Sequence, residues 1–143
     1  MSQHNIRNLT TLVALRNTEV ERLQTELAEK ESLRERYQKN LERLTGLYTN
    51  SGPSGNLHPA LAGNCGDYKQ AVMQMADSHR LDLHMHEADM ALSQQQLNAA
   101  WAKREVLGKV LVKQQKVVLA QQNVQERKQH DELATQLWIR GQK

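Results

Sequence analysis

The chain has 143 residues, which suits one domain, and it contains no phenylalanine and only 3% aromatic residues. A compact globule normally relies on aromatic bulk, so this composition argues against a thick core and favours long helices joined along a thin apolar seam. The net charge of +3 is too small to indicate nucleic-acid binding, which needs a dense basic face. The single cysteine, Cys65, excludes an internal disulfide and fits a reducing compartment. No apolar run is long enough to cross a bilayer, and no signal-peptide pattern is present, so we expect a cytoplasmic protein.

The residues that break helices are concentrated in one short stretch. Both prolines, Pro53 and Pro59, and four of the seven glycines fall in TNSGPSGNLHPALAGNCGD, residues 49–67. Proline and glycine at this density indicate a loop. The sequence therefore predicts one domain over 1–143, with a helix at about 5–49, a loop at about 50–66 and a second helix at about 67–138.

The first arm of the chain keeps a heptad pattern for its whole length. Alternating steps of three and four reach mostly apolar side chains, and a mean spacing of 3.5 residues is the coiled-coil signal. The positions of this stripe are Ile6, Leu9, Val13, Arg16, Val20, Leu23, Leu27, Lys30, Arg34, Tyr37, Leu41, Leu44 and Tyr48. The residues beside it are heavily charged, which favours a coiled coil over an ordinary amphipathic helix on a globule.

The second arm carries a poorer stripe. Asp67 and Gln70 are spaced as a helix-capping box, which places the start of the helix there. The stripe runs through Val72, Ala76, His79, Leu83, His86, Met90, Ser93, Leu97, Ala100, Arg104, Leu107, Leu111, Gln114 and Val118. We expect Gly108 to weaken it locally, and beyond Val118 the apolar residues no longer keep the period.

Two long helices joined by a loop most simply fold back as an antiparallel coiled-coil hairpin. If the pairing is centred near residue 58, Ile6 lies opposite residue 110 or so. The second helix would then overhang by about 30 residues, on the order of 40 Å. We expect this overhang to need a partner, because most helical stability comes from burying an apolar face.

Histidines and acidic residues gather in HRLDLHMHEAD, residues 79–89. His79–Asp82 and Asp82–His86 have chelating spacings, but His79 and His86 lie about 10.5 Å apart along a helix, too far to share one ion easily. We therefore interpret both histidines as seam residues, with His79 opposite Tyr37 and His86 opposite Lys30. The sequence predicts no metal site, no cofactor and no catalytic residue.

Charge is uneven along the second arm. Residues 67–89 carry five acids and two bases, and residues 103–116 carry five bases and one acid. The simplest interpretation is a solvated face, and the alternative is docking of an acidic protein partner. Nucleic acid is a weaker option, because Trp101 is the one aromatic residue among these bases.

Several local stretches are similar to one known family. They are HRLDL at 79–83, NAAWAKREVL at 98–107, KQQ at 113–115, and QERKQHDELATQ at 125–136 with Lys128, Asp131, Glu132 and Ala134 in a K-x-x-D-E-x-A pattern. Together with two arms separated by a polar loop, they make the chain resemble the flagellar export protein FliJ family over roughly residues 5–138.

The resemblance implies a non-enzymatic component of the bacterial flagellar type III export apparatus, which serves flagellum assembly and so motility and chemotaxis. Such proteins form an antiparallel coiled-coil stalk that binds the hexameric export ATPase FliI and the cytoplasmic domain of the export gate FlhA, and that assists export chaperones. It implies a cytoplasmic protein peripherally associated with the inner membrane at the flagellar base, without insertion and without nucleic acid. The alternatives are the equivalent stalk of a virulence type III secretion system and a plain scaffold coiled coil that dimerises in parallel.

The resemblance also implies which residues meet the partners. The gate-binding residues would be Leu41, Leu44, Leu47, Tyr48, Tyr68, Val72, Met75 and His79. A shift of one turn in the second arm would instead move that part of the surface towards Ala76 and Leu83. The ATPase-binding residues would be near the termini, especially Arg127, Lys128, Asp131 and Glu132.

Overall fold

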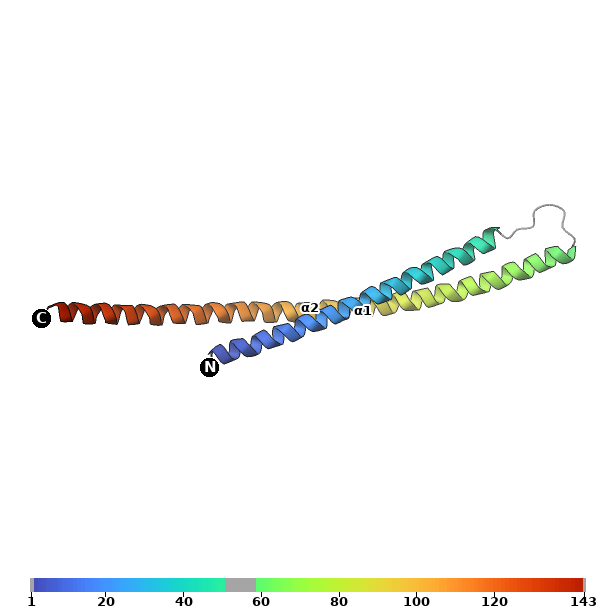
Figure 1. Cartoon of the computed structure of the whole chain (residues 1–143). Coiled ribbons are helices and arrows are strands. Elements are labelled where there is room, and N and C mark those ends of the chain that lie inside the picture. Colours follow the sequence, from blue (N-terminus) through green and yellow to red (C-terminus); the bar gives the residue numbers. More distant parts are fainter. Residues whose placement is uncertain (1, 51–58, 143) are drawn as a thin grey trace. The chain divides into compact units, whose positions relative to one another are not determined.

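A computed structural model describes residues 2–50 and 59–142, and these residues form two long helices (Figure 1). Helix α1 spans Ser2–Asn50 and helix α2 spans Pro59–Gly141. The described ranges contain no strand. The predicted all-α fold with a longer second helix is therefore confirmed.

Helix α2 begins earlier than the sequence pattern predicted. Its first residue is Pro59, so Gly63 and Gly66 lie inside the helix and Asp67 is an interior position rather than a cap. Proline suits a first helical position, because its fixed φ is helical and its missing N–H would have no partner there. Each glycine costs about 1 kcal/mol relative to alanine, which the continuing helix tolerates. The rest of the predicted loop, residues 51–58, lies outside the described residues.

The chain divides into two compact units, each of which combines a segment of α1 with a segment of α2. We call Glu21–Asn98 the hairpin unit, and Met1–Val20 with Ala99–Lys143 the terminal unit. In the hairpin unit the segments run antiparallel, because Lys30 contacts Asp89 whereas the later Tyr48 contacts the earlier Lys69. The same order holds in the terminal unit, where Leu9 and Leu12 share a groove with Val110 and Gln114, and the later Arg16 shares one with the earlier Ala102 and Leu107. The predicted antiparallel hairpin is thus confirmed, and the stripe of α1 that a parallel scaffold dimer would use is covered by α2.

The predicted heptad positions form the seam. From Ile6 to Leu44 every stripe position of α1 is buried or half-buried, and only Tyr48 is exposed; on α2 the same holds for every position from Val72 to Val118. The most buried apolar side chains are Val20, Leu23, Val72, Ala76, Leu83 and Ala100, and Ser93 is buried with them. All belong to the two predicted stripes. The core is thin because each helix offers only one stripe to the other.

Beyond Val118 helix α2 continues to Gly141, but every side chain from Leu119 to Gln142 is exposed. We call residues 119–141 the terminal extension. Figure 1 shows this orange-to-red part of α2 continuing past the N-terminal end of α1, which belongs to the same unit. The predicted overhang is therefore present, although α2 stays half-buried up to Val118 rather than only to about residue 110.

Candidate functional site

The α1 part of the predicted gate-binding surface lies at the C-terminal end of the helix. Leu41 and Leu44 are half-buried in the seam, whereas Leu47 and Tyr48 are exposed. Tyr48 is the seam position at which the pairing opens. The Lys69 ammonium group of α2 lies 5.6 Å from the centre of its ring, within the range of a cation–π contact. This contact holds the end of α1 beside the first turns of α2.

The α2 part of the predicted gate-binding surface is divided between seam and solvent. Tyr68 and Met75 are exposed, at 46% and 55%, and both therefore offer apolar surface to a partner. Val72 is only 4% exposed, so its side chain supports the seam rather than the surface. His79 is half-buried, and its buried Nδ1 atom has no hydrogen-bond partner among the described residues.

The alternative placement of that surface, shifted by one turn, offers less exposed apolar area to a partner. Ala76 and Leu83 are 5% and 6% exposed, because both are seam residues packed against α1. A partner could reach them only by separating the helices. Tyr68 and Met75 meet a partner without such a change.

A polar layer crosses the seam of the hairpin unit and involves Lys30, Tyr37, His86, Asp89 and Ser93. The Lys30 ammonium group donates a hydrogen bond of 2.6 Å to Ser93 Oγ and lies 2.9 Å from Asp89 Oδ2. His86 Nε2 lies 2.7 Å from the Lys30 carbonyl oxygen, so this nitrogen carries the proton and donates. The rings of Tyr37 and His86 lie 5.6 Å apart. The prediction that His86 lies opposite Lys30 is confirmed, and such a layer can fix the register of a coiled coil.

An ion pair lies beside this layer on α1. Arg34 donates hydrogen bonds from both Nε and Nη2 to the Glu31 carboxylate, the shortest at 2.7 Å. The bonded guanidinium lowers the pKa of the Glu31 carboxyl, and the carboxylate in turn raises the pKa of Arg34. Both groups are near solvent, so the pair holds the local side-chain arrangement more than it stabilises the fold.

The residues predicted to bind the ATPase lie on the terminal extension. Arg127, Lys128, Asp131 and Glu132 are all exposed, at helical spacings of three and four that place them on neighbouring turns. The extension also exposes large apolar residues, namely Leu119, Val124, Leu133, Leu137, Trp138 and Ile139. This stretch therefore presents both charge and apolar surface, with no helix of the described chain against it.

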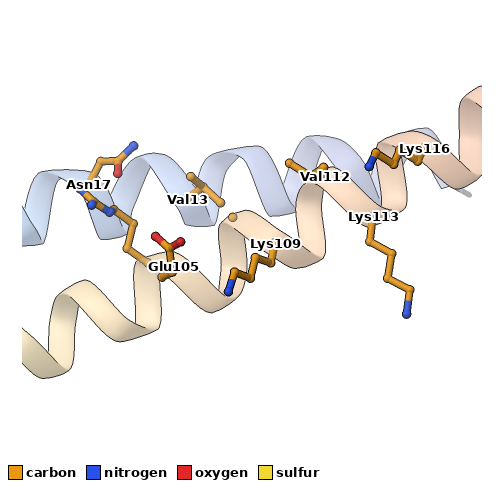
Figure 2. Close-up of a pocket in the computed structure, with 9 residues that line it drawn as sticks. Val13, Asn17, Glu105, Lys109, Val112, Lys113 and Lys116 are labelled. Atoms are coloured by element: carbon orange, nitrogen blue, oxygen red, sulfur yellow. The ribbon is translucent and has the colours of Figure 1, made fainter.

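The terminal unit also contains a basic groove of about 570 Å³. Figure 2 shows it between Val13 and Asn17 of α1 and a face of α2 that carries Lys109, Lys113 and Lys116. Arg104, Glu105, Gly108 and Val112 complete its lining. A Cβ atom at Gly108 would meet nothing within 4 Å, so the missing side chain leaves room in the groove. The base-rich run at 103–116 signalled this surface in the sequence, and the predicted pairing placed it beside α1, but the groove that it forms with Val13 and Asn17 did not show there.

Across 2–50 and 59–142, no three or more His, Cys, Asp or Glu side chains are arranged to hold a metal ion. Nor is either helix, over the same residues, long and apolar enough to cross a membrane.

Comparison with known proteins identifies the family. The family model described as "Flagellar FliJ protein" matches residues 5–143, nearly the whole chain. This chain belongs to the FliJ family. No curated protein and no solved structure matches it significantly. The FliJ family is a non-catalytic component of flagellar protein export, so the predicted membership and its flagellar context are confirmed. The FliJ match favours the flagellar apparatus over a virulence system.

Proposed function

We propose that this FliJ-family protein is a stalk that connects the hexameric export ATPase FliI to the export gate FlhA and assists the delivery of export chaperones. The observation that carries the proposal is the terminal extension, a helical stretch in which every side chain is exposed. Most helical stability in proteins comes from packing an apolar face, and within the described residues no such packing covers this stretch. A helix of this kind suits insertion into a ring that supplies the missing contacts.

The extension offers the two kinds of surface that such an insertion needs. Leu133 and Leu137 lie one turn apart, and Trp138 follows, which groups exposed apolar area near the end of α2. Tryptophan is prominent among the residues that dominate binding energy at interfaces. Arg127, Lys128, Asp131 and Glu132 carry charges of both signs, which can set the orientation of the helix against the ATPase.

The gate-binding surface is proposed in the hairpin unit. Leu47, Tyr48, Tyr68 and Met75 are exposed there, and the Lys69–Tyr48 contact ties the two helices together. Tyrosine combines a large apolar ring with a polar tip and is favoured at interfaces for that reason. Peripheral association with the inner membrane would follow from binding the gate, which requires no membrane-spanning helix in this chain.

The test separates the two partners. Leu137→Ala with Trp138→Ala is expected to abolish stimulation of the export ATPase and to leave binding of the FlhA cytoplasmic domain unchanged. Leu44→Ala with Leu47→Ala is expected to do the reverse, without loss of helicity by circular dichroism. A deletion strain that stays fully motile, or a purified protein that binds neither partner, would overturn the proposal.

Chaperone delivery is tested independently of these partners. A pull-down with the full-length wild type as bait should recover export chaperones. Each of the two double variants, used as bait in turn, should recover them equally well if the chaperones bind a different surface. Recovery with neither the wild type nor the variants would remove this part of the proposal only.

A further inference from the structure

The base-rich part of α2 lines a groove that neither proposed binding surface uses. The groove lies between Val13 and Asn17 of α1 and residues 104–116 of α2 (Figure 2). The proposed ATPase-binding extension begins after Val118, and the proposed gate-binding residues belong to the hairpin unit. All residues that line the groove belong to the terminal unit, so it is a separate surface built within one compact unit.

The floor of the groove is apolar and partly open. Val13 is half-buried, and Val112 is 49% exposed. Gly108 adds no side chain between the two helices, and a Cβ atom there would meet nothing within 4 Å. The volume of about 570 Å³ falls in the range of pockets that take up ligands. The groove therefore has room for apolar side chains of a partner.

Three lysines border this floor. Lys109, Lys113 and Lys116 are exposed and follow one another at spacings of four and three, so they lie on one face of α2. Figure 2 shows Lys109 and Lys113 extending to the same side of that helix. Within residues 2–50 and 59–142, the ion pairs are made by other basic residues. The three ammonium groups are thus available to a partner, and their aliphatic stems add to the apolar wall.

The charges along the groove are arranged asymmetrically. Glu105 is the acidic residue of the lining, and it precedes the three lysines on α2. Arg104 lies beside it, with its guanidinium group 5.5 Å from the centre of the Trp101 ring, within the range of a cation–π contact. A ligand gains most when its negative charges lie near the lysines and away from Glu105.

We propose that this groove binds an acidic amphipathic helix of a partner protein. Apolar side chains of that helix pack on Val13 and Val112 and fill the space at Gly108, while its carboxylates face the three lysines. An amphipathic helix laid into a groove is a recurring mode of recognition, and the complementary charges fix its orientation. The proposal goes beyond the stalk function, because neither the export ATPase nor the export gate is assigned to this surface.

A nucleic acid fits the groove less well than an acidic helix. Nucleic-acid grooves combine bases with aromatic side chains on which nucleobases stack, and among the described residues that line this groove none is aromatic. A phosphate backbone would also leave the apolar floor uncovered.

Fluorescence anisotropy with a labelled synthetic peptide of about 20 residues tests the proposal. Its leucines form one helical stripe with glutamates on both sides, and the full chain is the titrant. We expect a dissociation constant on the order of 10–100 µM, which rises at high salt because charge attraction is screened. Lys113→Glu should weaken binding about tenfold. Lys103→Glu is the matched control, since Lys103 is exposed in the same base-rich run but does not line the groove, and it should change binding by no more than about twofold.

A second pair of variants separates the groove from its charge. Gly108→Leu should fill the open space and weaken binding about tenfold, whereas the smaller Gly108→Ala should bind nearly as the wild type does. Both should keep their helicity by circular dichroism, because leucine and alanine favour a helix more than glycine does. A control peptide with serine in place of leucine should bind about tenfold more weakly, because it lacks the apolar side chains.

Three results would overturn the proposal. One is a failure of the acidic peptide to bind at about 300 µM chain. Another is equal weakening by Lys103→Glu and Lys113→Glu. The third is tighter binding of a single-stranded DNA probe that Lys113→Glu abolishes, which would assign the groove to nucleic acid. Peptide binding that survives Leu137→Ala with Trp138→Ala would show that the groove acts independently of the proposed ATPase-binding extension, whereas its loss would contradict a separate surface.

Discussion

Two parts of α2 differ sharply although they belong to one helix. Up to Val118 the heptad stripe meets α1 and is buried or half-buried, whereas every side chain described from Leu119 to Gln142 is exposed. The two parts have similar helix-forming residues, so local propensity does not separate them. What differs is the period of the apolar residues, because only a sustained 3.5-residue spacing keeps one face turned towards a partner helix. The paired part carries the fold, and the extension is left available for binding.

The largest expected difference in the free energy of unfolding is between truncating a leucine of the paired part and truncating one of the extension. Leu83→Ala should lower the free energy of unfolding by about 3 kcal/mol, because it leaves a cavity in a thin seam. Leu133→Ala, at a side chain that is 55% exposed, should change it by no more than about 0.5 kcal/mol. Urea denaturation followed by circular dichroism measures both. Equal effects would mean that the extension is packed as tightly as the seam.

The next largest difference in stability is expected at the polar layer. His86→Ala removes the hydrogen bond to the Lys30 carbonyl and the ring contact with Tyr37, and should destabilise the protein by about 1–2 kcal/mol. His84→Ala is the control, since His84 is exposed on the same turn of the helix, and should be nearly neutral. If both variants unfold at the wild-type urea concentration, the layer contributes no net stability.

At the groove of the terminal unit we expect a substitution to raise stability rather than lower it. Gly108→Ala should stabilise the helix by about 0.5–1 kcal/mol, because alanine has the higher helix propensity and its Cβ would meet nothing within 4 Å. Thermal unfolding of this variant should show a higher midpoint than the wild type. A lower midpoint would show that the groove closes over Gly108 more tightly than its open surroundings indicate.

The smallest expected effect is the pH dependence of the Glu31–Arg34 pair. The folded-state pKa of Glu31 lies below its unfolded value, so the pair's contribution is present at neutral pH and is lost as the pH falls through the lowered pKa. Glu31→Gln should therefore flatten the fall in thermal midpoint between about pH 5 and pH 3. Glu35→Gln, one residue from the pair, should leave that fall nearly unchanged. A wild-type profile in the Glu31 variant would contradict the assignment.

Much of the fold could be read from the sequence because a two-helix seam is set by spacing alone. The stripes on both arms, their antiparallel pairing and the facing of His86 and Lys30 follow from counting threes and fours. The start of α2 did not follow, because proline and glycine signal a loop locally, whereas Pro59 fits the first turn of a helix and the glycines inside it are only a modest cost. The basic groove did not follow either, because its walls come from both helices.

The family, the helical class and the apolar face of each helix follow from residue types and their spacing along one chain. Which parts of those faces are covered depends instead on how the two helices pack. Packing buries Val20 and Leu83 in the seam, leaves Tyr48 exposed, and joins Lys30 to Ser93 and Asp89. An apolar stripe indicates that a helix can bury one face. Burial also requires a second surface in register with that face, and this surface comes from elsewhere in the chain or from another molecule.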